Sequence, residues 1–301
     1  MLLDGVRVLD LSRQLPGGYC TQLLQAQGAQ VTKIEPPAGD PIRALPGGNA
    51  YFDALHRGKQ LLTLDLRTEA GREALRRRVV DADVIVEGFR PGVMERMEIG
   101  YASLAAINPA LVYCAITGYG SGGPMAGRAG HDLNYLARSG ALSLMSLRGG
   151  VPTIPGLQVA DMAGGLEAAF SIAGALVARA RTGQGTRVEV SMTDLMRNWT
   201  VLPRAARQAG VPGIPLRGEL PCYHVYAVAD GFLTVAALEA DFWAAFCKAI
   251  EREDLKDRQY DPAAIEAVQA TLRPATRAAW ATRFGNQDVC VEPVLGLDES
   301  D

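Results

Sequence analysis

The sequence predicts an α/β protein in two parts: a large domain with a parallel sheet and crossover helices, followed by a smaller α/β domain. Three observations support this prediction. Strand-like and helix-like segments alternate through the first 200 residues. The strand-like segments are continuous apolar runs, which are typical of strands that helices cover on both faces. Proline and glycine then gather between residues 203 and 221, a composition typical of a linker.

The large domain begins with a strand–helix–strand unit. "VRVLDLS" (6–12) and "VTKIEPP" (31–37) are the strands, and the helix between them runs from about residue 16 to the Gly28 that ends it. The next segments alternate in the same way: strand 61–66, helix 68–80, strand 83–89, a largely helical stretch over 90–108 and strand 111–120. Because these segments make at least two βαβ units, we expect a parallel sheet.

A long helix and a second sheet complete the expected elements. Segment 161–181 is apolar all round and is followed by Gly183, so we expect a well-buried helix with a glycine stop. "GTRVEVSM" (185–192) predicts a further strand. The smaller domain is expected to contain a hairpin over 223–238 that turns at "ADG", then helices over 239–250 and 262–271.

Composition and charge exclude several classes of function. The chain has 30 basic and 33 acidic residues, a formal charge of −3, so a general attraction to nucleic acid is not indicated. No apolar run reaches the ~20 residues of a membrane span, and the N-terminus lacks a secretory signal, so we expect a cytoplasmic protein without a membrane segment. The five cysteines lie far apart without a CxxC pair, so we expect neither a disulfide framework nor a metal site. Arg76–Arg78 lies in a helical pattern and predicts a solvated face.

Basic side chains follow several of the predicted strands. In open α/β sheets, ligands bind beyond the carboxyl ends of the strands, where Arg43, Arg67 and Arg90 lie in this sequence. Cations at several strand ends favour a ligand with phosphates, although scattered surface arginines would give the same pattern. The glycines of 118–123 match G-x-G-x-x-G, but a proline follows where a helix should begin, so a dinucleotide site is not predicted.

One histidine stands in an unusual setting. His131 directly precedes Asp132, after a glycine loop and at the predicted start of a helix, and Asp161 opens the long apolar helix. Inversion of a carbon that carries an acidic hydrogen requires a base on one face and a different acid on the other, and histidine and aspartate can each take either role in a partly buried site. Both helix starts would also present N–H groups to an enolate oxygen. Taken alone, His131 is more typical of a capping residue, and Asp161 of an N-cap.

Eight motifs follow one another along the chain: "LLTLDLRTEAG", "DVIVEGFRPGVMERMEIGY", "TGYGSGGP", "AGHDLNYLARSGAL", "VADMAGG", "TGQGTRVEVSM", "AALEADF" and "DVCVEPVL". Together they resemble the family III CoA-transferases, also called the CaiB/BaiF superfamily, and within it the α-methylacyl-CoA racemases. The resemblance runs from Gly5 to Leu297, nearly the whole chain.

The resemblance implies a fold and an assembly. The expected parts are a Rossmann-like CoA-binding large domain over 1–200, a linker over 201–221 and a small α/β domain over 222–288. An interlocked homodimer with its active site between subunits is also expected. Family members continue past the segment like "CVEPVL", so we expect 289–301 to be the start of a return segment that is cut short.

The resemblance also implies catalytic residues. In the racemases, the histidine of "GHDxNY" and the aspartate that opens the next long helix exchange the α-proton of a 2-methylacyl-CoA thioester, and these positions are His131 and Asp161 here. Asp132 is expected to orient its neighbour or the substrate. Glu239 matches an acid that lies near the catalytic histidine and would tune its basicity; an ordinary acid at a helix start is the alternative.

For the coenzyme, the resemblance implies contacts from three segments. These are Leu64, Asp65, Leu66 and Arg67; Gly88, Phe89 and Arg90 with Arg96; and Gly130, Asn134 and Tyr135. Pro36 is a departure, because similar racemases have an arginine there. Lys33 or Arg43 would have to supply that phosphate contact, with Lys59 a further candidate. CoA is expected as part of the substrate, with no separate cofactor.

The sequence therefore predicts a racemase or epimerase of 2-methyl-branched acyl-CoA thioesters that moves the α-proton through an enolate. Two alternatives remain. The first is a family III CoA-transferase with Asp161 as the nucleophile, against which His131 and the absence of a "GGGGQ"-type loop argue. The second is a CoA-binding protein without turnover.

Overall fold

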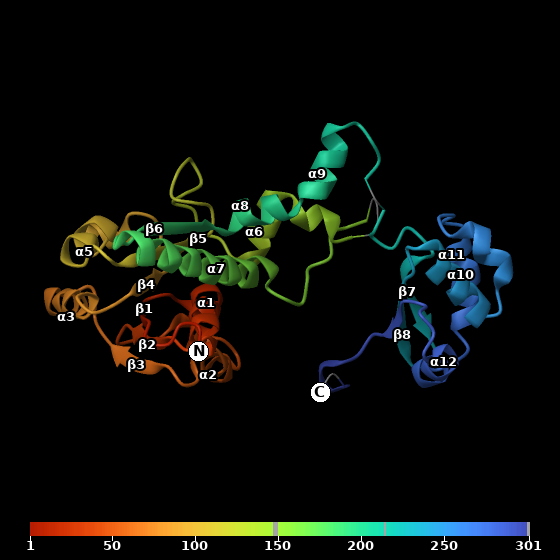
Figure 1. The fold of residues 1–301 in the computed structure, drawn as a ribbon, viewed down its shortest axis with the longest axis horizontal. Helices are drawn as coiled ribbons and strands as arrows, with labels where there is room; N and C mark the ends of the chain where they lie inside the picture. The colour runs from red at the N-terminus through yellow and green to blue at the C-terminus, as the bar shows by residue number, and fades with distance from the viewer. Residues whose placement is uncertain (147–149, 214, 300–301) are drawn as a thin grey trace. The chain divides into compact units, whose positions relative to one another are not determined.

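The computed structural model describes residues 1–146, 150–213 and 215–299 of the chain. They form two compact units: Met1–Leu142 with Ile154–Val201, and Ser143–Thr153 with Leu202–Asp301. Figure 1 colours both along the chain. The second unit therefore takes up residues 143–153, which the sequence assigned to the large domain.

The first unit is built on a six-stranded sheet. Its strands are β1 (Arg7–Asp10), β2 (Gln30–Glu35), β3 (Gln60–Thr63), β4 (Val84–Glu87), β5 (Val112–Thr117) and β6 (Arg187–Ser191). They run in the order β3-β2-β1-β4-β5-β6, and every neighbouring pair is parallel. This is the order of doubly wound sheets, so the predicted Rossmann-like fold is confirmed.

Helices cover both faces of the sheet, which explains the continuous apolar strands. Every residue of β4 and β5 is buried. Leu9, Ile85 and Tyr113 pack with Leu75 and Leu104 from the helices of one face, which are α3 (Glu69–Val79), α4 (Val93–Arg96) and α5 (Tyr101–Ile107). The residues that alternate with them along the strands meet the opposite face, where α1 (Gln14–Ala26) and α7 (Val159–Thr182) pack together (Figure 1).

Helix α7 is the long apolar helix that the sequence predicts, but it is only partly buried, because Leu166, Phe170 and Val177 are exposed. Gly183 ends it in the left-handed conformation, with φ of 72°. Among the described residues, α7 is the one helix whose length and composition would allow it to cross a membrane, a test that the core helix of a folded domain also passes. It contacts α1, β5, β6 and α8 (Met192–Trp199). Gly165 permits the close crossing with α1, because a Cβ there would lie 2.5 Å from the Pro16 carbonyl oxygen.

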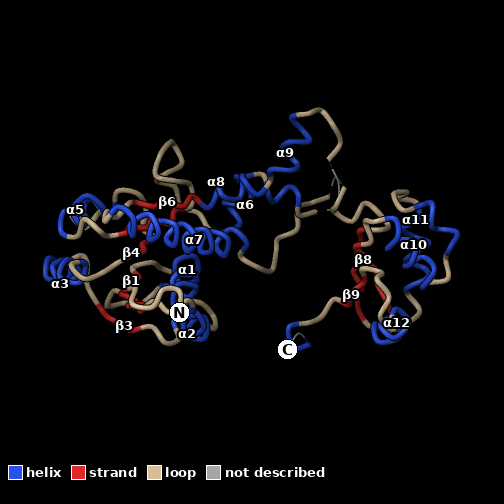
Figure 2. The backbone as a smooth tube through the Cα atoms, in the orientation of Figure 1, coloured by secondary structure: helices blue, strands red, loops and turns tan. Residues whose placement is uncertain are grey.

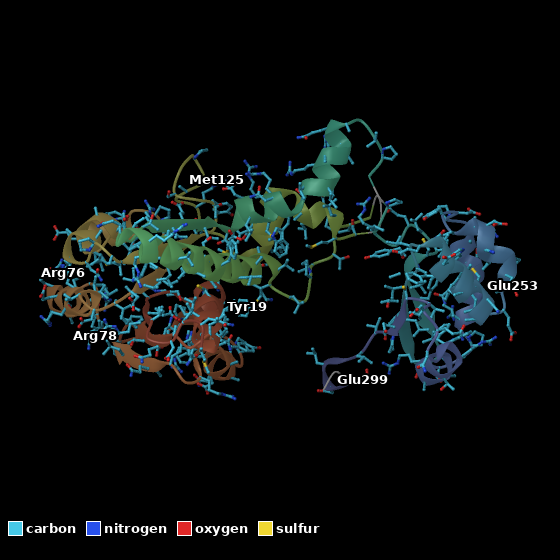
Figure 3. The ribbon with its side chains drawn as sticks, in the orientation of Figure 1. Tyr19, Arg76, Arg78, Met125, Glu253 and Glu299 are labelled. Atoms are coloured by element: carbon cyan, nitrogen blue, oxygen red, sulfur yellow. The ribbon has the colours of Figure 1, made fainter. Side chains whose placement is uncertain are left out.

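Shorter elements complete the first unit (Figure 2). A 3-10 turn, η1 (Pro41–Ala44), leads into α2 (Gly48–His56), and α6 (Asp132–Ser139) follows the loop after β5. On α3, Arg76 pairs with Glu69 and Glu73, and Arg77 also pairs with Glu73. Arg76 and Arg78 lie on the outer side of the unit, as the sequence predicts for a solvated face (Figure 3).

The second unit packs helices on a three-stranded antiparallel sheet. Its elements are α9 (Val201–Gln208), β7 (Tyr223–Val228), β8 (Gly231–Ala236), α10 (Ala240–Ala249), η3 (Glu253–Arg258), α11 (Ala264–Leu272), α12 (Arg277–Phe284), β9 (Val291–Pro293) and η4 (Leu297–Glu299); η2 (Ala141–Leu144) joins the two units. The predicted hairpin turns at Ala229 and Asp230. The core of the second unit includes the fully buried aromatic side chains Tyr226, Trp243 and Phe246.

Two segments differ from their expected form. Residues 201–208 of the expected linker form the helix α9, none of whose residues is buried. Residues 291–293, expected to begin a return segment, instead form β9, which pairs with β8 as the third strand of the small sheet. The β9 strand depends on tertiary packing, because it pairs with the open edge of β8 and no periodicity within three residues could predict that.

Candidate active site

Two cavities of the first unit lie where the strand order reverses. The strand-end cavity, of about 630 Å³, is lined by residues that follow β1, β2, β3 and β4. The histidine cavity, of about 340 Å³, is lined by residues that follow β1, β4 and β5 and by His131, Tyr135 and Asp161. The cavities adjoin at the switch point between β1 and β4, because the same five residues line both: Arg13, Pro41, Gly88, Phe89 and Arg90.

His131 occupies the N-cap position of α6. Its backbone is extended, with φ of −129°, and its N–H donates to Oδ1 of Asn134 at 3.0 Å. Its carbonyl oxygen accepts from Asn134 and Tyr135, which begins the helix. The side chain is exposed and lines the histidine cavity. The expected helix start is therefore correct, and it leaves the imidazole accessible.

Asp161 comes from the other helix and lines the same cavity. It is the third residue of α7 rather than its N-cap, which is Gln158. Burial, and then the nearby charge of Asp132, raises the pKa of Asp161 to about 7. A carboxyl group with this pKa can accept or return a proton near neutral pH.

Asp132 joins the two helices. Its Oδ1 accepts from the backbone N–H groups of Ala160, at 2.6 Å, and Asp161, at 3.1 Å, so a residue of α6 caps α7. The remaining two N–H groups of the first turn of α7 bond to Leu157 and Gln158. The expectation that α7 would present N–H groups to an enolate oxygen is therefore wrong, because all four of these groups are already bonded.

Tyr135 lines the same cavity as His131 and Asp161. Its ring is buried and stands edge-on to Tyr119 with centroids 5.1 Å apart, and its hydroxyl donates to the Gly130 carbonyl oxygen. Gly118 lies against the same ring, and any Cβ at that position would overlap the ring. Burial, and then the charge of Asp161, raises the pKa of Tyr135 to about 12, so its hydroxyl keeps its proton at neutral pH.

The residues that the resemblance assigns to the coenzyme divide into two groups. Most of them line the strand-end cavity, the histidine cavity or both: Leu64, Asp65, Leu66, Arg67, Gly88, Phe89, Arg90, Gly130 and Tyr135. Arg96, on α4, and Asn134, which bonds to the His131 backbone, line neither. Arg67 is exposed and pairs with Asp65 at 2.8 Å.

The substitute phosphate ligands do not reach the cavity. Lys33 has no exposed surface, and its Nζ lies 3.0 Å from Asp40 and 3.8 Å from Asp10. Lys59 is also buried, 3.5 Å from Asp10. Burial lowers the pKa of Lys59 to about 8, against the opposing effect of Asp10. The expectation that Lys33 or Lys59 binds a phosphate is therefore wrong, because buried carboxylates compensate the charges of both lysines.

Arg43 is also engaged by a carboxylate. Its Nε lies 3.1 Å from Oε1 of Glu35, and its guanidinium lies 3.3 Å from the centroid of the Phe52 ring.

Glu239 occupies the N-cap position of α10 in the second unit. Its expected place near the catalytic histidine, and the homodimer that would bring subunits together there, stay predictions.

The sequence alone missed Arg13, Gln14 and Arg128, all of which line the histidine cavity. A signal for the first two was present, because the turn after the first strand is a usual ligand-binding position in doubly wound sheets. Gln14 adopts the left-handed region, with φ of 60°, which is uncommon outside glycine. In the described residues, no group of three or more His, Cys, Asp or Glu side chains could hold a metal ion.

Comparison with known proteins places the chain in a family. The model of CoA-transferase family III matches residues 3–300. The chain is similar to the human α-methylacyl-CoA racemase, with 34% identity over 99% of this chain and 79% of the relative, and to the succinyl-CoA:mesaconate CoA-transferase of Haloarcula marismortui, with 37% identity over 95% and 76%. Its fold resembles that of a CAIB/BAIF family protein from Brucella suis, with a TM-score of 0.87, 30% identity and coverage of 99% and 85%. The chain therefore belongs to CoA-transferase family III.

Proposed function

We propose that this protein is a racemase or epimerase of 2-methyl-branched acyl-CoA thioesters. The observation that carries the proposal is that His131 and Asp161, which come from two different helices, line one cavity, where burial raises the pKa of Asp161 to about 7. Two groups that can each hold or release a proton are the minimum for inversion at a carbon. The human racemase relative, which matches nearly the whole chain, supports the same activity.

The reaction follows from the two protonation states. In one direction, neutral His131 removes the α-proton, and protonated Asp161 returns a proton to the opposite face of the carbon. In the other direction, ionised Asp161 removes the proton and the imidazolium returns it. The pair begins each direction with one proton. Each turnover leaves the substrate's α-proton on the group that acted as base and delivers the other group's proton to the product, so the pair again holds one proton.

The enolate oxygen formed between these steps needs hydrogen-bond donors. The first two N–H groups of α6, on Asp132 and Leu133, have no backbone acceptor within the helix. These groups lie at the positive end of the α6 dipole, next to His131. One donor of this kind typically lowers a barrier by about 3 to 4 kcal/mol.

The adjoining strand-end cavity supports an acyl-CoA substrate. Its volume of about 630 Å³ lies within the range of small-molecule sites, and it shares the lining residues Gly88–Arg90 with the histidine cavity. A coenzyme in the larger cavity would therefore direct its thioester toward the reacting pair. In this proposal CoA is part of the substrate.

A CoA-transferase is the second candidate, because the Haloarcula transferase is similar over 95% of the chain. In that reaction the Asp161 carboxylate attacks the thioester carbonyl, an acyl anhydride forms on Asp161, and the CoA thiolate leaves. A pKa of about 7 leaves enough ionised Asp161 for this attack at neutral pH. The transferase reaction would not require His131.

Isotope exchange distinguishes these functions. The protein is incubated in D₂O with a 2-methylacyl-CoA, and α-deuterium is followed by mass spectrometry. A racemase exchanges the α-proton without any second acid. A transferase instead moves CoA to an added carboxylic acid and forms a hydroxylamine-sensitive adduct on the enzyme. A protein that binds CoA but does neither is a binding protein without turnover.

Matched variants test the residues. His131→Ala and Asp161→Ala should each reduce racemisation severely, whereas Asp53→Ala, at an exposed aspartate of α2, should not. Loss of CoA transfer in Asp161→Ala, with full CoA transfer in His131→Ala, would favour the transferase. Full activity in both variants would remove the pair from the mechanism.

A further inference from the structure

Arg13 lies at the junction of the two cavities. It follows β1 at the switch point of the sheet and lines both the strand-end and the histidine cavity. A molecule that extends from one cavity into the other must therefore pass Arg13. The side chain is exposed, so its guanidinium can reach such a molecule.

The position of Arg13 is fixed from three sides. Its guanidinium carbon lies 4.6 Å from the centroid of the Phe89 ring, a cation–π contact. The residues on either side of it are held by buried carboxylates: Asp10 accepts from Ser12 N–H at 3.0 Å, and Asp40 accepts from Gln14 N–H at 3.2 Å. A side chain held in this way loses less conformational entropy when it binds a ligand.

Lys33 fixes the same segment from behind. It donates to the Ser12 carbonyl oxygen and forms its ion pairs with the two carboxylates that hold Ser12 and Gln14. The buried lysine that cannot reach a ligand itself thus helps to set the backbone on which Arg13 stands.

The charge of Arg13 is not compensated by a side chain. Four other cations near the strand ends have carboxylate partners: Lys33 and Lys59 pair with Asp10, Arg43 pairs with Glu35, and Arg67 pairs with Asp65. Within residues 1–146, 150–213 and 215–299, no carboxylate lies within ion-pair distance of Arg13, and the same is true of its neighbour at the junction, Arg90. The junction therefore carries two positive charges that attract an anionic group.

We propose that Arg13 binds a phosphate of the coenzyme, either the diphosphate or the 3′-phosphate. A guanidinium presents donors along its edge in a plane, so it can bond phosphate oxygens while its face stays on Phe89. This inference rests on the proposed function only in taking an acyl-CoA as the substrate, and it requires no particular reaction at Asp161.

Calorimetric titration of the full chain tests the proposal with three ligands: CoA, 3′-dephospho-CoA and pantetheine. Arg13→Ala should weaken CoA binding about tenfold or more, because a hydrogen bond to a charged group is lost, and Arg13→Lys should recover part of that loss. The control is Arg181→Ala, at an exposed arginine near the far end of α7. Pantetheine, which has no phosphate, should bind the wild type and Arg13→Ala equally well.

The ligand series identifies the phosphate. If the loss in Arg13→Ala persists with 3′-dephospho-CoA, Arg13 binds the diphosphate; if the loss disappears, Arg13 binds the 3′-phosphate. The proposal is overturned if Arg13→Ala binds CoA within twofold of Arg181→Ala, or if pantetheine loses as much affinity as CoA. Absence of CoA binding by the wild type would refute the acyl-CoA substrate itself, which is a different result from failure at Arg13 alone.

Discussion

Asp161→Asn should stabilise the protein at alkaline pH. Burial raises the pKa of the folded carboxyl group to about 7, against an ordinary value of 3.8. Between these values the folded state holds a proton that the unfolded state has lost, so the contribution of Asp161 to the free energy of unfolding falls as pH rises, and the full penalty applies above pH ~7. The difference is roughly 3 pKa units, and 1.36 kcal/mol per unit gives at most about 4 kcal/mol. Asparagine has a similar shape and no charge, so the variant should avoid this penalty.

Urea unfolding at about pH 5 and about pH 8.5 measures the effect, with the variant compared with the wild type at each pH. Near pH 5 the folded carboxyl group is protonated but the unfolded one is largely ionised, so roughly 1.2 pKa units of the penalty, about 1.6 kcal/mol, already apply to the wild type. Near pH 8.5 Asp161→Asn should be more stable by a few kcal/mol. Asp53→Asn, at an exposed position of α2, serves as the control. If the stability gained by Asp161→Asn is no larger at about pH 8.5 than at about pH 5, the carboxyl group does not have the raised pKa on which the mechanism depends.

Four further predictions concern groups around the site. Asp132→Ala removes the cap of α7 and should lower stability by about 1 kcal/mol in urea unfolding, whereas Asp132→Asn keeps an accepting oxygen and should be milder. Asp132→Asn also removes a charge that raises the pKa of Asp161. When the rate of α-proton exchange is plotted against pH, the change of rate near pH 7 should therefore move to lower pH, and an unchanged midpoint would contradict this coupling. Glu87→Gln should stabilise the protein above pH ~7, because burial raises the pKa of Glu87 to about 7 and glutamine can still accept from Phe89 N–H; equal stability at all pH values would contradict this. Lys33→Met removes the lysine that pairs with buried Asp40 and leaves Asp10 with Lys59, and it should cost about 3 to 5 kcal/mol by thermal unfolding, a loss that Lys248→Met, at an exposed lysine of α10, should not reproduce.

Local pattern was sufficient for much of the fold. The alternation of apolar runs with amphipathic segments predicted the parallel sheet, and Gly183 predicted the end of α7. Three segments take a form that the sequence did not predict: Ser143–Thr153 groups with the second unit, residues 201–208 form α9 and residues 291–293 form β9. The three residues of β9 depend on the edge of β8 with which they pair rather than on a period of their own. Helix α9 has no buried residue, so packing does not explain it.

The candidate site divides in the same way. His131 at a helix start could be predicted from the glycine loop and the motif that follows it. The role of Asp132 could not, because its partners on α7 are 28 and 29 residues away in the sequence. Lysines were candidate phosphate ligands by residue type, yet whether a lysine faces a ligand or a buried aspartate depends on packing.

The sequence by itself determined the elements, their order and the presence of an imidazole and a carboxyl group at the starts of two successive helices. All three are properties of neighbouring residues, which the chain carries before it folds. Only the tertiary structure decided that these groups line one cavity, that Asp161 has a pKa of about 7, and that Lys33 is enclosed while Arg13 is exposed. The physical reason is that burial and charge pairing arise between residues that folding brings together from distant parts of the chain.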